Sequence, residues 1–192
     1  MNINIWGPGL WEIIHSVAFN YNNINIPENI KRKKYINLFI SLIYLIPCNR
    51  CKNHYIFFLE KKNIKKYASS YYHIIRWTNH LHNNVNSRLN KKIFTLEESK
   101  NKYIKNNKLK ISHNKIYNFI NNCIYNIKQS QLKHLKTFLN SIIHLYPCDI
   151  CQKKLLSTTI LLQKNNIFIR KIKNIKQLHL LYSKIKDCFQ HK

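Results

Sequence analysis

Two cysteines in a C-x-x-C arrangement, Cys48 and Cys51, are the residues of this sequence best suited to covalent chemistry. They follow Pro47, and a helix-compatible run begins with them. Proline is favoured at or just before a helix start, where the first amide hydrogens lack an intrahelical partner. A thiolate there lies at the positive end of the helix dipole, and the nearby Arg50, Lys52 and His54 favour it further. The pair is therefore a candidate redox-active disulfide.

The same spacing occurs in zinc sites, so the motif alone leaves two interpretations open. A second pair, Cys148 and Cys151, supplies enough thiolates for a four-cysteine zinc site. The chain has six cysteines and shows no signal-peptide pattern after Met1. Such a set indicates redox or metal chemistry rather than a disulfide scaffold.

The composition favours helices. The chain has 192 residues, 45% of them hydrophobic, which is enough to fill a core. It contains only two glycines and four prolines, fewer turn residues than a multi-stranded sheet normally needs. We therefore expect an all-α fold. The longest apolar stretch, residues 35–47, is too short and too interrupted to cross a bilayer, so we expect no membrane span.

The formal net charge of +26 is the usual mark of a protein that binds nucleic acid or an anionic surface. Here the lysines are spread along the whole chain among abundant Asn and Ile, with no single basic cluster. An AT-rich genome produces that mixture without selection for a basic face. A basic nucleic-acid-binding helical protein stays an alternative function, and a structural zinc-binding protein is the other.

Hydrophobic periodicity predicts four helices that could position the first cysteine pair. The first should begin near Leu10, because Gly7-Pro8-Gly9 is expected to stop anything before it. The others are predicted over residues 28–45, from the cysteine pair to about 60, and from 70 to about 92. Four antiparallel helices with short loops are typical of a bundle.

The fourth predicted helix carries an unusual polar group. His82 and Asn86 share a face at i and i+4, with Asn83 beside them. Asn is a poor helix former, so several amides and an imidazole together suggest contacts to a polar ligand. Trp11 and Trp77 offer stacking surfaces for a ring system.

An internal repeat relates the two halves of the chain. A shift of 100 residues places Pro147-Cys148-x-x-Cys151 on Pro47-Cys48-x-x-Cys51, and Phe119 on Phe19. The second copy lacks the polar group, with Ile at 111, Lys at 115, and Tyr, Ser and Lys at 182, 183 and 186. The predicted units are residues 1–96 and 111–192, with a linker at 97–110.

Three motifs of the first unit together resemble the Erv/ALR family of FAD-dependent sulfhydryl oxidases. They are Trp6-Gly-Pro-x-x-Trp11-x-x-x-His15, Pro47-Cys48-x-x-Cys51 and Trp77-x4-His82-Asn83-x-Val85-Asn86-x-x-Leu89-x-Lys91. A tandem chain in which one copy keeps these motifs also looks like the two-unit sulfhydryl oxidases of large insect DNA viruses, such as baculoviruses.

The resemblance implies an Erv-type bundle of four or five helices that holds FAD, followed by a second, degenerate helical bundle. It implies that Cys48 and Cys51 are catalytic. Thiol-containing protein substrates would react at the outer Cys48, and electrons would pass from Cys51 through FAD to molecular oxygen, giving hydrogen peroxide. It implies no metal. The implied cofactor-binding residues are Trp11, His15, Trp77, His82, Asn83, Val85, Asn86, Arg88 and Lys91.

For the second pair, Cys148 and Cys151, three roles stay open: a shuttle of electrons to Cys48, a structural disulfide, or a vestige. Cys188 is a further shuttle candidate. Because the family usually forms dimers, we expect a homodimer or an intrachain pseudo-dimer of the two units. If the chain is viral, we expect it in the host cytoplasm, the nucleus or the virion, ahead of the mitochondrial intermembrane space.

One departure from the family pattern concerns stability. Asn79 and Leu96 stand where many relatives carry a structural cysteine pair. Such a bridge contributes roughly 2–4 kcal/mol. We expect packing against the second unit to offset part of that loss.

Overall fold

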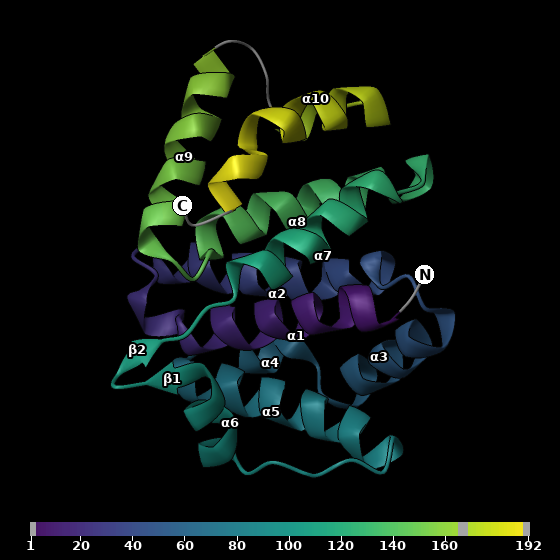
Figure 1. The fold of residues 1–192 in the computed structure, drawn as a ribbon, viewed down its shortest axis with the longest axis vertical. Helices are drawn as coiled ribbons and strands as arrows, with labels where there is room; N and C mark the ends of the chain where they lie inside the picture. Colours follow the sequence, from purple (N-terminus) through teal and green to yellow (C-terminus); the bar gives the residue numbers. More distant parts are fainter. Residues whose placement is uncertain (1–2, 165–168, 190–192) are drawn as a thin grey trace.

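The predicted all-α fold is confirmed in a computed structural model that describes residues 3–164 and 169–189 (Figure 1). The first half contains α1 (Ile3–Phe19), η1 (Tyr21–Asn23), α2 (Glu28–Leu45), α3 (Asn49–Lys61), α4 (Ile64–Tyr67), α5 (Tyr71–Arg88) and α6 (Leu96–Tyr103). A short antiparallel hairpin follows, β1 (Ile104–Lys105) and β2 (Lys108–Leu109). The second half contains α7 (His113–Tyr125), η2 (Gln129–Gln131), α8 (Leu132–Leu145), α9 (Asp149–Lys164), η3 (Ile169–Lys171), α10 (Ile175–Ile185) and η4 (Lys186–Phe189).

The helices reproduce the 100-residue repeat. Helix α2 ends at Leu45 and α8 ends at Leu145, and α3 and α9 then begin at residues 49 and 149. In both copies a proline and the first cysteine of the pair separate the two helices. Proline fixes its own φ and disfavours the helical region for the residue before it, which explains the break at the same place.

The two halves pack through equivalent helices, α2 against α8 and α1 against α7 (Figure 1). The α2–α8 pair is antiparallel: Lys34 Nζ donates to the Asn140 carbonyl at 3.1 Å, and Gln131 Nε2 donates to the Tyr44 carbonyl at 2.6 Å. The end of α2 therefore meets the start of α8. Contact between the same surface of two copies is the arrangement found in two-fold symmetric dimers.

This antiparallel packing separates the two cysteine pairs. The first pair follows the end of α2 and the second follows the end of α8, so they lie at opposite ends of the interface; α3 and α9 accordingly stand on opposite sides in Figure 1. An 18-residue helix such as α2 is about 27 Å long at 1.5 Å per residue. The four cysteines of the two pairs therefore form no common zinc site.

Gly9 permits the close approach of α1 to α7. A Cβ atom built on Gly9 would collide with the Lys115 carbonyl oxygen and lie 2.7 Å from Phe119 Cβ. Helix α1 also packs on α5, and its residues from Glu12 to Phe19 are all buried. Helix α1 is therefore the central helix of the fold. A helix that is buried on every side is expected to be hydrophobic all round.

The prediction that the first helix begins near Leu10 is wrong, because α1 begins at Ile3 and contains Pro8. Pro8 lies near the start of the helix, where it removes one backbone hydrogen bond. Trp6 and Leu10 are buried against the core on either side of it. Tertiary packing of this turn therefore outweighs its poor helix propensity.

Two further boundaries differ from the prediction. Helix α5 ends at Arg88 rather than near residue 92, and Asn90 follows with a φ of 50°, in the left-handed region that Asn tolerates. The segment 97–110, predicted as a linker, contains most of α6 and the hairpin, and Thr95 and Glu98 form a capping box at the start of α6. Residues 165–168 and 190–192 of the predicted second unit lie outside the described residues.

None of the helices in the described ranges combines the length and the apolar character that a bilayer span requires.

Candidate functional site

The first cysteine pair forms a disulfide at the start of α3. Cys48 is the N-cap residue, its sulfur accepts a hydrogen bond from the Cys51 amide at 3.1 Å, and the two Cα atoms are 5.2 Å apart. An N-terminal amide directed at sulfur stabilises the thiolate that forms on reduction. Loss of solvent, followed by the charges of Arg88 and Arg50, lowers the pKa of His54, so this histidine adds less positive charge than the sequence suggests.

A cavity of about 190 Å³ lies beside the disulfide, between α1, α3 and α5. Cys51 lines this cavity, whereas Cys48 is not among its lining residues. The pair therefore has one sulfur at the cavity, that of Cys51, and one outside it. The remaining wall is mainly apolar, formed by Ile3, Trp6, Gly7, Leu10, Trp11, Ile14, Ile46, Tyr55, Leu81, Val85 and Leu89, with Arg50, His54, Asn84 and Arg88 as polar members.

Two buried nitrogen atoms at this cavity have no hydrogen-bond partner in the described structure: Nε1 of Trp6 and one guanidinium nitrogen, NH1, of Arg88. A buried donor without a partner costs about 1–3 kcal/mol, and more when it is charged. Burial, followed by the charge of Arg50, lowers the pKa of Arg88. Both donors are thus available to a ligand, and Arg88 is suited to an anion.

A stack of rings continues from the cavity wall. The His82 ring lies parallel to Trp11 with centroids 3.9 Å apart, and His82 Nδ1 is 2.7 Å from His15 Nε2. His15 in turn stacks on Tyr103 at 4.7 Å. Burial, followed by the charges of Lys102 and Lys91, lowers the pKa of His82 to about 4, and burial lowers that of His15 well below its usual value. Both imidazoles are therefore neutral at pH 7.

Asn83 and Asn86, the amides predicted to contact a ligand, hydrogen-bond to the chain that follows α5. Asn83 Nδ2 donates to the Phe94 carbonyl at 2.7 Å and its Oδ1 accepts from the Phe94 amide at 3.0 Å. Asn86 Nδ2 donates to the Lys92 carbonyl at 3.0 Å. Asn79, one of the two positions at which the resemblance suggests a cysteine pair in relatives, accepts from Ser99 Oγ at 2.5 Å. This hydrogen bond joins α5 to α6.

Of the other predicted residues, Val85 and Arg88 line the cavity and Trp77 does not. Trp77 is fully buried, packs on Phe39 and Phe58, and donates from Nε1 to the Lys62 carbonyl at 2.7 Å. It is a core residue here. Lys91 is exposed beyond the end of α5, where it faces solvent.

Sequence reasoning did not single out Tyr103, which closes the ring stack from α6. Burial, followed by the charge of Glu12, raises its pKa, so the phenol stays protonated. Glu12 is itself buried and accepts a hydrogen bond from the Ser112 amide at 2.8 Å, joining α1 to the start of the second half. No sequence signal marks Tyr103, because its place in the site depends on how α6 folds back on α1.

The shuttle candidates lie elsewhere. Cys148, Cys151 and Cys188 form no disulfide in the described residues. Burial, followed by a hydrogen bond with Cys148, raises the pKa of Cys151 to about 12, which makes its thiol a weak nucleophile at neutral pH. With the second pair at the far end of the α2–α8 interface, direct exchange with Cys48 would have to occur between two chains.

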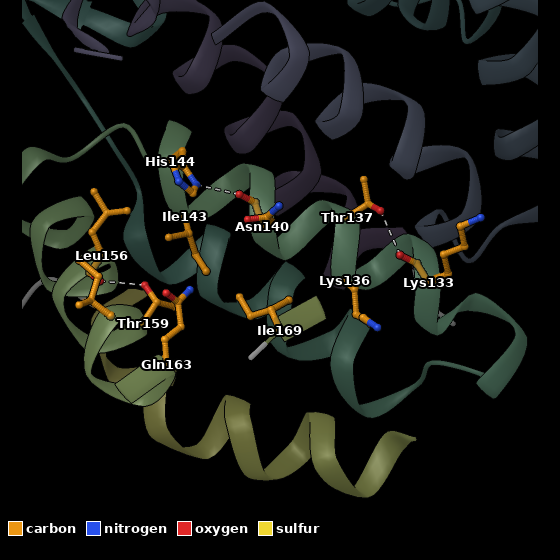
Figure 2. A pocket seen from close by; sticks show the side chains of 11 residues that line it. Lys133, Lys136, Thr137, Asn140, Ile143, His144, Leu156, Thr159, Gln163 and Ile169 are labelled. Carbon is orange, nitrogen blue, oxygen red and sulfur yellow. Dashed lines mark hydrogen bonds between the residues drawn. The ribbon is translucent and has the colours of Figure 1, made fainter. Parts of the chain in front are cut away.

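A larger cavity, of about 610 Å³, opens between α8 and α9 (Figure 2). Its wall mixes apolar side chains with lysines and amides, and Figure 2 shows Thr137 and His144 bonded to their own helix. Among the described residues that line it there is no cysteine, tryptophan or carboxylate. The described lining is Lys133, Lys136, Thr137, Asn140, Ile143, His144, Leu156, Thr159, Ile160, Gln163 and Ile169.

The fold and the first-half site define a helical redox protein whose C-x-x-C disulfide borders an apolar cavity. Residues 8–104 match the family model of the Erv1/Alr family, half of the chain, and the chain belongs to this family.

Viral proteins are among its relatives. An "FAD-linked sulfhydryl oxidase" of African swine fever virus is 35% identical over 98 residues, which cover 51% of this chain and 79% of the relative. The protein of the same name from another isolate is 34% identical over the same length. A "Probable FAD-linked sulfhydryl oxidase R368" of Acanthamoeba polyphaga mimivirus is 34% identical over 95 residues, 49% of this chain and 65% of the relative. No solved structure matches the chain.

Proposed function

We propose that the protein is an FAD-linked sulfhydryl oxidase that forms disulfide bonds in thiol-containing proteins and reduces molecular oxygen. The observation that carries this proposal is the position of Cys51: one sulfur of a helix-capping disulfide borders an apolar cavity that also contains Trp11 and the unsatisfied guanidinium of Arg88. The family to which the chain belongs and the names of its relatives support the same conclusion.

The residues of the cavity fit FAD. Its apolar wall suits a flat ring system, and the two unsatisfied donors, Trp6 Nε1 and Arg88 NH1, suit ring-edge acceptors and phosphate oxygens. The enclosed volume of about 190 Å³ is below the roughly 300–1,000 Å³ typical of ligand sites, so the enclosed part would hold only a portion of the cofactor. Trp11, His82, Val85, Arg88 and Lys91 are the proposed contacts, with His15 and Tyr103 behind the stack and Asn83 and Asn86 fixing the neighbouring loop.

The protein's own part in the reaction is thiol–disulfide exchange. A substrate thiolate attacks Cys48 Sγ, the Cys48–Cys51 bond breaks, and Cys51 leaves as a thiolate beside the cavity. The second substrate thiolate then attacks the substrate sulfur of the mixed disulfide and releases Cys48. The substrate has lost two electrons and two protons, and Cys48 and Cys51 hold them as a dithiol. When bound, FAD would accept that electron pair from Cys51 and transfer it to oxygen, giving hydrogen peroxide.

We also propose that residues 1–96 form the catalytic unit and residues 111–192 a degenerate second unit, joined by 97–110, with the second unit in the place of a dimer partner. The pairing of α1 with α7 and of α2 with α8 supports an intrachain pseudo-dimer. The viral relatives support a viral origin, and we propose the host cytoplasm, the nucleus or the virion as the compartment.

The test is the visible absorption spectrum of the full-length protein before and after dithiothreitol is added in air, with oxygen recorded in the same cuvette. We expect a bound-flavin spectrum that bleaches and recovers as oxygen is consumed. A colourless protein that takes up no added FAD would sink the proposal. The net charge of +26 suggests nucleic-acid binding as an alternative function. This alternative predicts strongly salt-dependent DNA binding that survives mutation of both C-x-x-C motifs.

A further inference from the structure

The second cysteine pair is part of a three-residue cluster that the first pair lacks. One side-chain nitrogen of His113 and the sulfur atoms of Cys148 and Cys151 all lie within 4.8 Å of one another. The Cys151 sulfur is 3.9 Å from His113 Nδ1. His113 is the first residue of α7, and the two cysteines flank the start of α9, so two separate helices converge on one point.

The repeat shows what has replaced the cofactor cavity. A shift of 100 residues puts Tyr146 at the position of Ile46 and Phe189 at that of Leu89, both cavity-lining residues in the first half. The two larger rings are fully buried, pack edge to face with centroids 5.6 Å apart, and are tied by a bond from the Tyr146 hydroxyl to the Phe189 carbonyl at 2.8 Å. The space beside the second pair is therefore filled with side chains.

The same shift puts His113 at the position of Ile13, a buried aliphatic residue of α1. The imidazole is thus specific to the second half. The phenol oxygen of Tyr146 lies 3.3 Å from His113 Nδ1, the same nitrogen that faces the Cys151 sulfur. Binding of a metal ion at Nδ1 would replace this contact.

The distances suit a tetrahedral ion. With zinc–sulfur and zinc–nitrogen bonds of about 2.3 and 2.0 Å, the ligand atoms of a tetrahedral site stand about 3.5–3.8 Å apart. The observed 3.9 Å between Cys151 Sγ and His113 Nδ1 is close to this value, and the 4.8 Å limit on the whole cluster allows closure by small side-chain rotations. Two sulfur donors and one imidazole select zinc-type ions over calcium or magnesium, which prefer oxygen.

We propose that His113, Cys148 and Cys151 bind one zinc ion, with the fourth position taken by water. Cys188 is not among the three residues of the cluster, and its sulfur lies 3.6 Å from Thr158 Oγ1. Two thiolates neutralise the divalent ion, which suits a chain whose net charge is already +26. Binding releases the two thiol protons to solvent. This assignment differs from the sequence expectation that the protein holds no metal.

The site would join the second half together. Its ligands come from α7 and from the α8–α9 junction, and α7 is the helix that packs on α1 of the catalytic half. Zinc there would stabilise the surface that supports α1, at a distance from the flavin site.

The test measures zinc and flavin in the same sample of full-length protein. The protein is reduced, stripped with a chelator, reloaded with one equivalent of zinc and passed through a desalting column before metal analysis. We expect about one zinc per chain for the wild type and for Cys123→Ser, a control that removes a thiol near the opposite end of α7. His113→Ala and Cys151→Ser should lose at least nine-tenths of the zinc and keep their flavin.

A cobalt titration of the wild type keeps the proposal testable if these variants do not fold. Stoichiometric cobalt should produce thiolate-to-metal charge-transfer absorption that zinc abolishes. Absence of that absorption, retention of zinc by His113→Ala, or a Cys148–Cys151 disulfide that forms in place of metal binding would each overturn the assignment. Flavin content distinguishes this failure from failure of the proposed function, because the cofactor site lies in the other half of the molecule.

Discussion

The two C-x-x-C pairs start equivalent helices, α3 and α9, after equivalent prolines, yet their surroundings differ. The first pair is a disulfide whose inner sulfur borders a cavity. The second is outside any disulfide, and its inner sulfur faces His113. The helix and the cysteine spacing are therefore common to both, and the residues opposite the inner sulfur decide which chemistry is available.

Those residues come from other helices. In the first half, α1 and α5 supply Trp11 and Arg88 and leave space between them. In the second half, Tyr146 and Phe189 fill that space and leave no room for a large cofactor. At positions 46 and 89, the aliphatic side chains that line the first cavity are replaced by rings in the second half.

The largest expected effect separates the two inner cysteines. Cys51→Ser should lower thiol oxidase turnover per bound flavin by roughly 10³-fold or more, because no inner sulfur remains to pass electrons on. Cys151→Ser, the equivalent change in the second half, should stay within about two-fold of the wild type. Oxygen consumption with dithiothreitol and with a reduced protein substrate measures both. A large loss of turnover in Cys151→Ser would place the second pair on the electron path.

The next effect concerns the contact between the halves. Gly9→Ala should lower the free energy of unfolding by about 3 kcal/mol, because its Cβ has no room against Phe119 and the α7 backbone. Gly7→Ala is the matched control. Its Cβ would meet only Ile3 Cγ1, at 3.4 Å, so we expect no loss and a gain of up to about 1 kcal/mol from helix propensity. Urea denaturation followed by circular dichroism compares the two, and equal stabilities would contradict the close approach.

A smaller effect follows from His15 and His82, whose equivalent positions in the second half are Lys115 and Tyr182. The pKa of His82 falls from 6.5 unfolded to about 4 folded, so between these values the unfolded chain binds more protons. Stability is then fully present above about pH 6.5 and is lost as pH falls toward 4. Allowing for the partial exposure of the ring, we expect a loss of roughly 2 kcal/mol.

Denaturation midpoints at several pH values between 4 and 7 measure this dependence. His82→Tyr, which introduces the residue found at position 182, should flatten the curve in that window. If His82→Tyr kept the full pH dependence, the loss would have to come from other groups.

The sequence predicts the helices well where hydrophobic spacing and caps agree. The predicted range 28–45 and the break at Pro47 coincide with α2 and its end. The 100-residue repeat places the same break at residues 145–149, where α8 ends and α9 begins. The start of α1 could not be predicted, because Gly7, Pro8 and Gly9 are poor helix formers locally. Their helical conformation depends on burial of neighbouring rings and on contact with α7.

The candidate site shows the same contrast between what the sequence predicts and what depends on packing. The family resemblance singled out Cys51, Trp11 and Arg88, and all three line the cavity. It assigned Asn83 a ligand contact, whereas the structure shows both ends of that amide bonded to the backbone of Phe94. Which partner an amide takes depends on loop folding, and periodicity carries no information about that. His113 was missed for a similar reason, since it meets Cys151 only after α7 and α9 pack.

The smallest expected effect is on FAD binding and tests Arg88, whose equivalent in the second half is Cys188. Arg88→Met keeps an apolar side chain in the wall and removes the guanidinium whose NH1 is buried without a partner. Loss of a charge-assisted hydrogen bond of about 1.5 kcal/mol raises Kd for FAD roughly ten-fold. Flavin fluorescence during titration of the stripped protein measures this change. Arg76→Met is the control on the same helix, because Arg76 is exposed and contacts Tyr72 at the surface.

If both variants bound FAD as the wild type does, the cofactor would not use Arg88. The unsatisfied nitrogen would then be a cost that the fold carries without a ligand to offset it.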